Sequence, residues 1–230
     1  SILVLIGFLS WFFTKDNKQE LSLSDGFVIT VLFWIVLSVS GSIPFILFGF
    51  GIVDSFFESM SGITTTGATV IAGLDDLPKS LLIYRQLLQW LGGMGLIVLA
   101  IAVMPLLGIG GGQLFKTQTP GPMSEQRLTP RITSTARALW SIYFVLTVLC
   151  IFAYRLAGMS YFDAVSHAFS TVSIGGFSTH DLSIGFFDSL SIEIVCITFM
   201  LLSAMSFAVH YSAIYRLSLI HISEPTRHVD

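Results

Sequence analysis

The chain has 230 residues, of which 53% are hydrophobic and 11% are charged, and its mean hydropathy is +0.83. A soluble globular domain carries about 25% charged residues, so this composition argues against a soluble protein. The formal net charge of −3 is small, and the sequence has no basic stripe with interleaved aromatic residues, which leaves nucleic acid without support as a partner.

Long apolar runs alternate with polar connections along the chain. A transmembrane helix needs about 20 apolar residues. Residues 1–13 are too few, so they are interpreted as the end of an N-terminal transmembrane helix. Four longer runs are expected to span the membrane, and the stretch between the second and the third is rich in Gly and Pro, which is typical of a loop. The expected spans are residues 27–48, 81–107, 138–156 and 186–211, and the loop is residues 108–137.

Two half-polar segments, residues 52–70 and 161–179, each lie between two of these spans. In both, an amphipathic run of about ten residues leads into small hydroxyl residues and then Gly; a helix of that length is roughly 15 Å long, about half the hydrocarbon thickness. We therefore expect the chain to enter the membrane, turn and leave on the same side. When the two segments are aligned at an offset of 109 residues, three pairs of positions hold identical residues: Asp54 and Asp163, Ser61 and Ser170, and Gly67 and Gly176.

We call each of these re-entrant segments a dip. The order of spanning helix, dip and spanning helix occurs twice and indicates an internal repeat. The first unit covers residues 24–107 with its turn at 64–69, and the second covers residues 138–216 with its turn at 173–179. These units predict an all-α multi-pass membrane protein built from tandem repeats of helix, re-entrant pore loop and helix. The tail that follows, from residue 217 to the end, fits neither unit, and two interpretations stay open: a non-native tail or an ordinary cytoplasmic loop.

The distribution of Lys and Arg predicts the orientation in the membrane. Basic residues gather in the loop 108–137 and in the connection 14–25, so we expect this side to be cytoplasmic. The opposite side holds most of the acidic residues, and Glu58 and Arg85 are counted among its charges. Both dips are therefore expected to open outward.

The turns at the two dips are candidates for holding a desolvated monovalent cation. An ion that leaves water needs a replacement shell, and backbone carbonyls supply one without a full charge that would trap the ion. Gly reaches positive φ at low cost, which lets successive carbonyls point the same way. The candidate residues are Thr64, Thr65, Thr66, Gly67 and Ala68 in the first dip, and Ser173, Ile174, Gly175, Gly176 and Phe177 in the second.

Several stretches resemble the TrkH/TrkG-type membrane subunits of the Trk/Ktr/HKT potassium transporter superfamily. They are TTTGAT in the first dip, SIGGFSTHD in the second, and QWLGGMGLIVLAIAVMPLLGIGG, KTQTPGP and LTPRI between them. The resemblance covers nearly all of residues 1–216. It implies four such units in one chain around a single potassium pathway, a pseudo-fourfold channel-like pore of which the present chain holds half.

The same resemblance implies the surroundings of the pore. It places the protein in the bacterial inner membrane, in contact with lipid, as a homodimer when full length, with a cytosolic nucleotide-binding regulatory subunit of the TrkA type. Potassium is then the transported ion, with no cofactor and no enzymatic activity. The carbonyls implied as its ligands are those of Thr65, Thr66, Gly67, Ile174, Gly175 and Gly176.

Two alternatives from other classes were weighed. A secondary transporter with re-entrant hairpins commonly has inverted repeats, whereas the charge distribution here indicates two units that run the same way. An intramembrane serine hydrolase would use Ser173 as nucleophile with His167 or His210 as base. His167 precedes Ser173 by only six residues, which argues against that pairing.

Structural roles are expected for the remaining notable residues. Cys150 and Cys196 lie within apolar runs and are interpreted as small core residues rather than a disulfide or a metal pair. On a half-buried helix, His167 is more often a hydrogen-bonded packing residue than a pH sensor. Asp54 and Asp163 stand just ahead of the amphipathic runs, which favours helix capping over attraction of ions.

Overall fold

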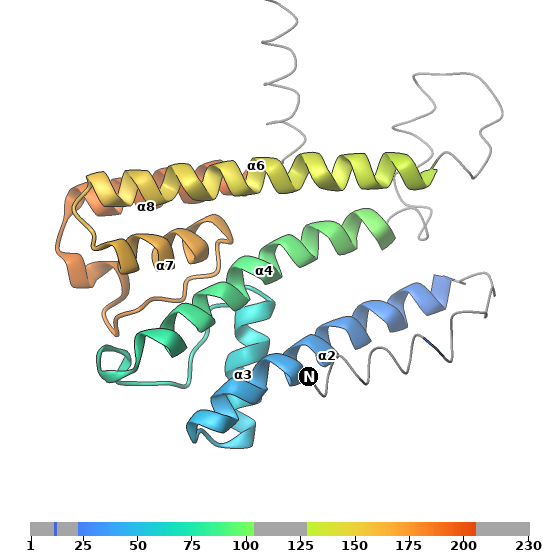
Figure 1. Ribbon diagram of the computed structural model, residues 1–230, viewed down its shortest axis with the longest axis horizontal. Helices are drawn as coiled ribbons and strands as arrows, with labels where there is room; N and C mark the ends of the chain where they lie inside the picture. Colours follow the sequence, from blue (N-terminus) through green and yellow to red (C-terminus); the bar gives the residue numbers. More distant parts are fainter. Residues whose placement is uncertain (1–11, 13–22, 104–127, 206–230) are drawn as a thin grey trace, which may run out of the picture.

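A computed structural model describes residue 12, residues 23–103 and residues 128–205, and these ranges contain helices and no strands (Figure 1). Two units follow each other along the chain, and each consists of a long helix, a short helix, an extended loop and a second longer helix. The long–short–long order predicted from the sequence is therefore present twice. The helices are α2 (Leu23–Phe48), α3 (Ile52–Ile63) and α4 (Lys79–Val103) in the first unit, and α6 (Leu128–Leu156), α7 (Tyr161–Val172) and α8 (Leu190–Ala204) in the second, with the 3-10 turns η1 (Leu74–Asp76) and η3 (Ser183–Phe187) after the loops.

The longer helices expose apolar side chains along much of their length. Within the described residues, Phe27–Phe48 and Leu139–Leu156 are long and apolar enough to cross a membrane, and Leu190–Ala204 is a shorter apolar helix. Large side chains such as Leu47 and Phe152 point outward, 81% and 63% exposed. Such a surface is unfavourable in water and favourable against lipid tails, which is consistent with the membrane protein predicted from the composition.

Helix boundaries differ from the predicted ones at two places. Helix α6 begins at Leu128, so the loop predicted for residues 108–137 is wrong over its last part. The last span begins at Leu190, because η3 occupies Ser183–Phe187 and the chain turns again before entering α8. The rest of that loop, the connection 14–22, the tail from residue 217 and His210 lie outside the described residues.

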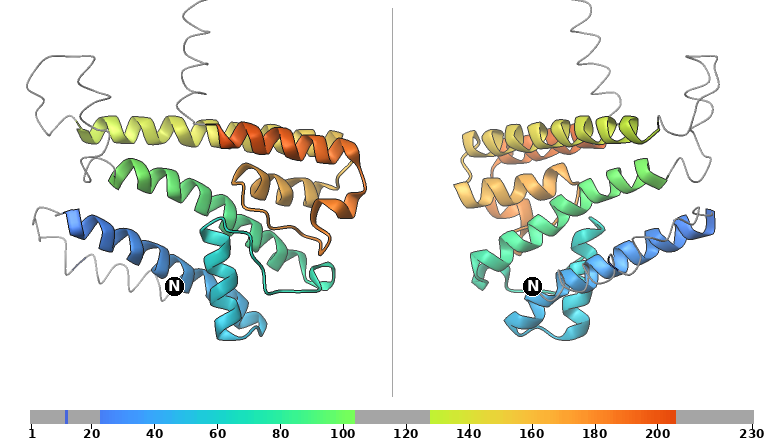
Figure 2. Two further views of the ribbon diagram at one scale, coloured as in Figure 1. Left: turned by 180° about the vertical axis from the view of Figure 1, so that it is seen from behind. Right: turned by 45° about the vertical axis from the view of Figure 1, so that its right-hand side comes forward.

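Helix α4 lies between the two units and is the element on which the short helices converge. It packs against α3 of its own unit and against α7 of the next, while α6 packs on α7 and α8 (Figure 2). The short helices differ at their N-termini. Ser160 caps α7, since its hydroxyl accepts from Asp163 N–H at 3.1 Å and donates to the Asp163 carboxylate at 2.7 Å, whereas the Gly51 cap of α3 makes no side-chain hydrogen bond. The capping role expected of Asp163 and Asp54 is therefore wrong: both lie in the first turn of their helices, and the cap residues are Ser160 and Gly51.

Small residues on α4 allow this convergence. A Cβ added at Gly92 would collide with the carbonyl group of Ile63 at the end of α3, and one at Gly93 would lie 3.1 Å from Ser173 Cβ at the end of α7. At Gly95 the nearest atoms belong to Phe33, at 4.0 Å. Gly92 and Gly93 thus allow close packing where α4 meets the ends of both short helices.

The contact between α3 and α4 gives a stability test. We expect Gly92→Ala to lower the free energy of unfolding by about 1–3 kcal/mol, because the added methyl group meets backbone that cannot rotate away. Gly95→Ala, on the same helix, should be neutral or stabilising by up to about 1 kcal/mol through helix propensity. Thermal unfolding of the two purified variants in detergent measures the difference, and equal midpoints would contradict the close approach at Gly92.

Candidate functional site

The chain leaves α3 and α7 through two loops with the same backbone conformation. In the first loop Thr65 has φ of 54° and Gly67 has φ of 78°; in the second, Ile174 has φ of 55° and Gly176 has φ of 84°. These pairs stand 109 residues apart, the offset of the sequence repeat. Thr and Ile are both β-branched, and positive φ is a genuine outlier for such residues, so the surroundings impose this conformation in both loops.

Hydrogen bonds at the helix ends repeat at the same offset. Thr66 N–H donates to Ser61 O at 2.9 Å, and Gly175 N–H donates to Ser170 O at 2.8 Å. The hydroxyls at the two helix C-caps behave alike as well. Thr64 Oγ1 donates to a carbonyl of the last turn at 2.7 Å, and Ser173 Oγ does so at 2.8 Å. Both loops are therefore held as continuations of their short helices.

The carbonyl groups after these turns are open to a ligand. Within the part of the chain that the structure describes, no hydrogen-bond donor reaches the carbonyls of several successive residues in each loop. An unpaired carbonyl at membrane depth has to face water, a cavity or an ion. The six carbonyls that the resemblance implies as ligands are among them, those of Thr65, Thr66, Gly67, Ile174, Gly175 and Gly176, and the carbonyls of Thr64, Ser173 and Phe177 accept no hydrogen bond from described residues either.

The two loops meet at their glycines. A Cβ added at Gly67 would collide with the carbonyl oxygen of Gly175, so the backbones touch where only hydrogen stands on Cα. On its other side the second loop borders a cavity of about 340 Å³, lined in part by Ile174 and Gly176. The structure thus brings the predicted residues of the two dips together.

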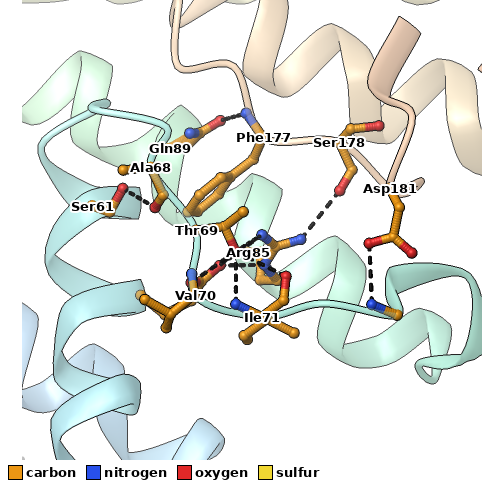
Figure 3. Close-up of polar contacts among 12 residues, drawn as sticks. Ser61, Ala68, Thr69, Val70, Ile71, Arg85, Gln89, Phe177, Ser178 and Asp181 are labelled. Atoms are coloured by element: carbon orange, nitrogen blue, oxygen red, sulfur yellow. Dashed lines mark hydrogen bonds and ion pairs between the residues drawn. The ribbon is translucent and has the colours of Figure 1, made fainter. Parts of the chain in front are cut away.

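The predicted residues at the ends of each loop have other contacts. Ala68 O accepts a hydrogen bond from Ser61 Oγ at 2.5 Å, which ties it to α3 (Figure 3). Phe177 is buried, and its N–H donates to Gln89 Oε1 at 3.1 Å. Helix α3 thus holds the first loop at Ala68, and α4 holds the second loop at Phe177.

A buried ion pair lies behind the first loop. Arg85 Nη2 is 2.6 Å from Glu58 Oε1, and both side chains are fully buried. The Glu58 carboxylate also accepts from Thr69 Oγ1 at 3.0 Å and from Val70 N–H at 3.2 Å. The sequence interpretation that counted Glu58 and Arg85 as outer-side charges is wrong: they neutralise each other inside the protein, where an unpaired charge would be costly.

The second unit has a neutral counterpart of this contact. His167 and Ser178 occupy the positions of Glu58 and Thr69, and His167 Nε2 lies 2.9 Å from Ser178 Oγ. His167 is buried and also contacts Asp163 O through Nδ1, which confirms it as a hydrogen-bonded packing residue. Ser173, the nucleophile considered for a hydrolase, donates to helix carbonyls, and it makes no hydrogen bond to His167.

The outer ends of the two loops are also joined. The Asp181 carboxylate accepts from Gly73 N–H at 3.1 Å and from Leu74 N–H at 3.0 Å (Figure 3). Asp75 faces the His180 ring, and the hydrogen bond between them lowers the pKa of the Asp75 carboxyl below its ordinary value. A short acidic rim therefore spans both units outside the loops.

The cysteines are free, Cys150 buried and Cys196 partly buried, as predicted. The residues that sequence reasoning missed are Glu58, Arg85 and Gln89. An available signal was their chemistry: polar and ionisable residues in segments expected at membrane depth mark functional or supporting sites by default and require partners.

Comparison with known proteins identifies a family and relatives that the chain resembles. It matches the family model "TrkH: Cation transport protein" over residues 1–224. It is 54% identical over 215 residues to the Trk system potassium uptake protein TrkH of Vibrio parahaemolyticus, covering 92% of this chain and 44% of that protein. It is 48% identical over 218 residues to TrkG of Escherichia coli K12, covering 94% of this chain and 45% of that protein.

A solved structure agrees with these matches. The crystal structure of the potassium transporter TrkH from Vibrio parahaemolyticus aligns with a TM-score of 0.80 and 52% identity, covering 92% of this chain and 42% of that chain. Paired helical units with facing non-helical loops and an apolar exterior define an all-α membrane transport protein. More particularly, the chain belongs to the TrkH cation transport protein family, and it spans less than half the length of these relatives.

The Asp75–His180 contact predicts a pH dependence. Because the folded-state pKa of Asp75 is lowered, the contact stabilises the protein above the unfolded-state pKa of about 3.9 and loses that effect as pH falls below it. We expect Asp75→Asn to lower the unfolding midpoint by about 1–2 °C at pH 6, as for an exposed pair, and by less near pH 3, because protonation of Asp75 progressively removes the contact. Asp76→Asn, next along the chain, is the control. A shift that is the same at both pH values would contradict the assignment.

Proposed function

We propose that the chain forms part of a potassium uptake pathway across the bacterial inner membrane. The observation that carries this proposal is the pair of loops with one backbone conformation, whose donor-free carbonyls meet at Gly67 and Gly175. Carbonyl oxygens in such an array replace the hydration shell of a monovalent cation. In this proposal potassium is the transported ion, and its coordination by backbone carbonyls needs no cofactor.

The electrostatics of the two units support a cation. Helices α3 and α7 both end at the loops, so the partial negative charge of each C-terminus faces the carbonyl array. On the outer side, Asp75, Asp76 and Asp181 are exposed and lie beside the loop ends. Carboxylates at a mouth raise the local concentration of cations, while among the described residues no charged side chain hydrogen-bonds to the donor-free carbonyls.

The relatives support the substrate and the extent of the pathway. They are named as Trk system potassium uptake proteins, and the present chain matches less than half of each. The pathway then needs further units beside these two, a homodimer in the full-length protein and a nucleotide-binding regulatory subunit on the cytosolic side. Two units alone enclose half of such a pathway, and selective potassium flux from the purified chain in liposomes would overturn that view.

A glycine substitution tests the assignment of the loops. We place this segment in the full-length Vibrio parahaemolyticus relative and compare Gly67→Ser with the unsubstituted chimera in liposomes. The side chain meets the Gly175 carbonyl and displaces it, so we expect the potassium/sodium flux ratio to fall by about tenfold, equivalent to ~1.4 kcal/mol.

The matched control is Gly73→Ser. Gly73 has nearly the same φ, +74° against +78°, but nothing lies within 4 Å of an added Cβ. Backbone strain alone would lower protein yield equally in both variants and leave the flux ratio of Gly73→Ser unchanged. An unchanged ratio in Gly67→Ser removes Gly67 from the ion pathway.

A further inference from the structure

The two units differ in what their last helices offer to the neighbouring loop. In the first unit α4 carries Arg85 and Gln89, and both reach the second loop. At the offset of 109 residues, α8 carries Ile194 and Thr198. Ile194 is 55% exposed, and the Thr198 hydroxyl donates to its own helix at 2.7 Å. The polar link therefore belongs to the first unit and is absent from the equivalent described positions of the second.

Arg85 makes contacts on both sides of the junction. Towards the first loop, Nε donates to Glu58 Oε1 at 2.7 Å and Nη2 donates to Thr69 Oγ1 at 3.0 Å. Towards the second loop, Nη1 donates to Ser178 O at 3.2 Å, and the guanidinium carbon lies 4.3 Å from the centre of the Phe177 ring (Figure 3). One planar group thus fixes the ends of both loops at once.

Each loop is also held by a side chain of its own short helix, Glu58 in α3 and His167 in α7, and these contacts do not involve Arg85 as donor to the loop. In the second unit the His167–Ser178 contact holds the loop without any charge. In the first unit Glu58 does the same work through Thr69 and Val70, but as a carboxylate it requires a buried cation. What Arg85 adds beyond neutralising Glu58 is the link to Ser178 and Phe177.

We propose that Arg85 is a positioning residue for selectivity: it sets the second loop against the first, and Glu58 holds it in place. This inference rests on the proposed function, since it concerns the spacing of the carbonyls that face the ion. Arg85 contacts loop residues on either side and none of the donor-free carbonyls, so it acts through the loops. A small change in the distance between the two loops alters the positions of the carbonyl oxygens that would coordinate the cation.

Two substitutions separate the link from the charge. Arg85→Lys keeps a cation beside Glu58 but replaces a planar five-donor group with a point charge that cannot reach both loops. The double variant Glu58→His with Arg85→Ile gives the first unit the residues that the second unit already tolerates at these positions. Neither leaves a buried charge unpaired, so both are expected to fold.

The experiment measures selectivity and loop order in the same chimeric full-length protein. In liposomes we expect both variants to pass potassium with a potassium/sodium flux ratio lowered about fivefold to tenfold. Amide hydrogen exchange should quicken in residues 66–73 and 175–181 together. The control is Gln86→Leu on the same helix: Gln86 is fully buried, and among the described residues its amide makes no hydrogen bond. It should change neither quantity.

The outcomes distinguish this inference from the proposed function. If the variants keep the parent's flux ratio, or if exchange quickens without any loss of selectivity, Arg85 does not position the loops for selectivity. If Gln86→Leu lowers the ratio as much as Arg85→Lys, the effect is general loosening of α4 and the inference fails. If the unsubstituted chimera passes no potassium, or is insensitive to Gly67→Ser, the proposed function fails, and amide exchange still reports whether Arg85 orders both loops.

Discussion

Main-chain polar groups at membrane depth need partners, and this requirement governs the structure around the two loops. An α-helix satisfies its own backbone, whereas a loop does not. Here the N–H groups at the start of each loop donate to carbonyls of the preceding short helix. The far ends of the loops are held by side chains, those of Glu58, Arg85, Gln89 and His167. Carbonyls in between accept no hydrogen bond from the described residues, and the role in ion transport proposed above rests on them.

The repeat preserves backbone geometry more faithfully than side-chain chemistry. Positive φ values recur at the same two positions of each unit, although one pair is Thr and Gly and the other is Ile and Gly. The clamp behind the loop is a carboxylate on a threonine in one unit and an imidazole on a serine in the other. Shape is therefore common to the units, and the distribution of charge is particular to each. The first unit carries the ion pair and the contacts that extend to its neighbour.

The sequence sufficed for the order of long and short helices and for the position of the turns after the short helices. These follow from long apolar runs and from small residues recurring at a fixed offset, both of which are local patterns. The start of α6 at Leu128 was missed because Pro and hydroxyl residues there resemble a loop, and Pro is tolerated in the first turn of a helix.

The side chains that support the loops could not be assigned from local patterns. Glu58 and Arg85 are 27 residues apart, and Arg85 and Ser178 are 93 apart. Each contact depends on how α3 and α7 pack against α4, and a single sequence holds no direct record of that packing. Charge counting placed Glu58 and Arg85 at the surface, because it treats every ionisable residue near a helix end as solvated. Burial reverses the inference, since two opposite charges in contact cost less inside than either alone.

The link from Asp181 to the turn at Gly73 and Leu74 has a consequence for biogenesis. The acceptor is made 108 residues after the first of its donors. At a synthesis rate of roughly 5–20 residues per second, the ribosome needs on the order of 5–20 s to reach it. During that interval these two amides lack the carboxylate acceptor that they have in the folded structure. The turn at Gly73 and Leu74 therefore gains its final hydrogen bonds only after the second unit has been synthesised and has packed beside the first.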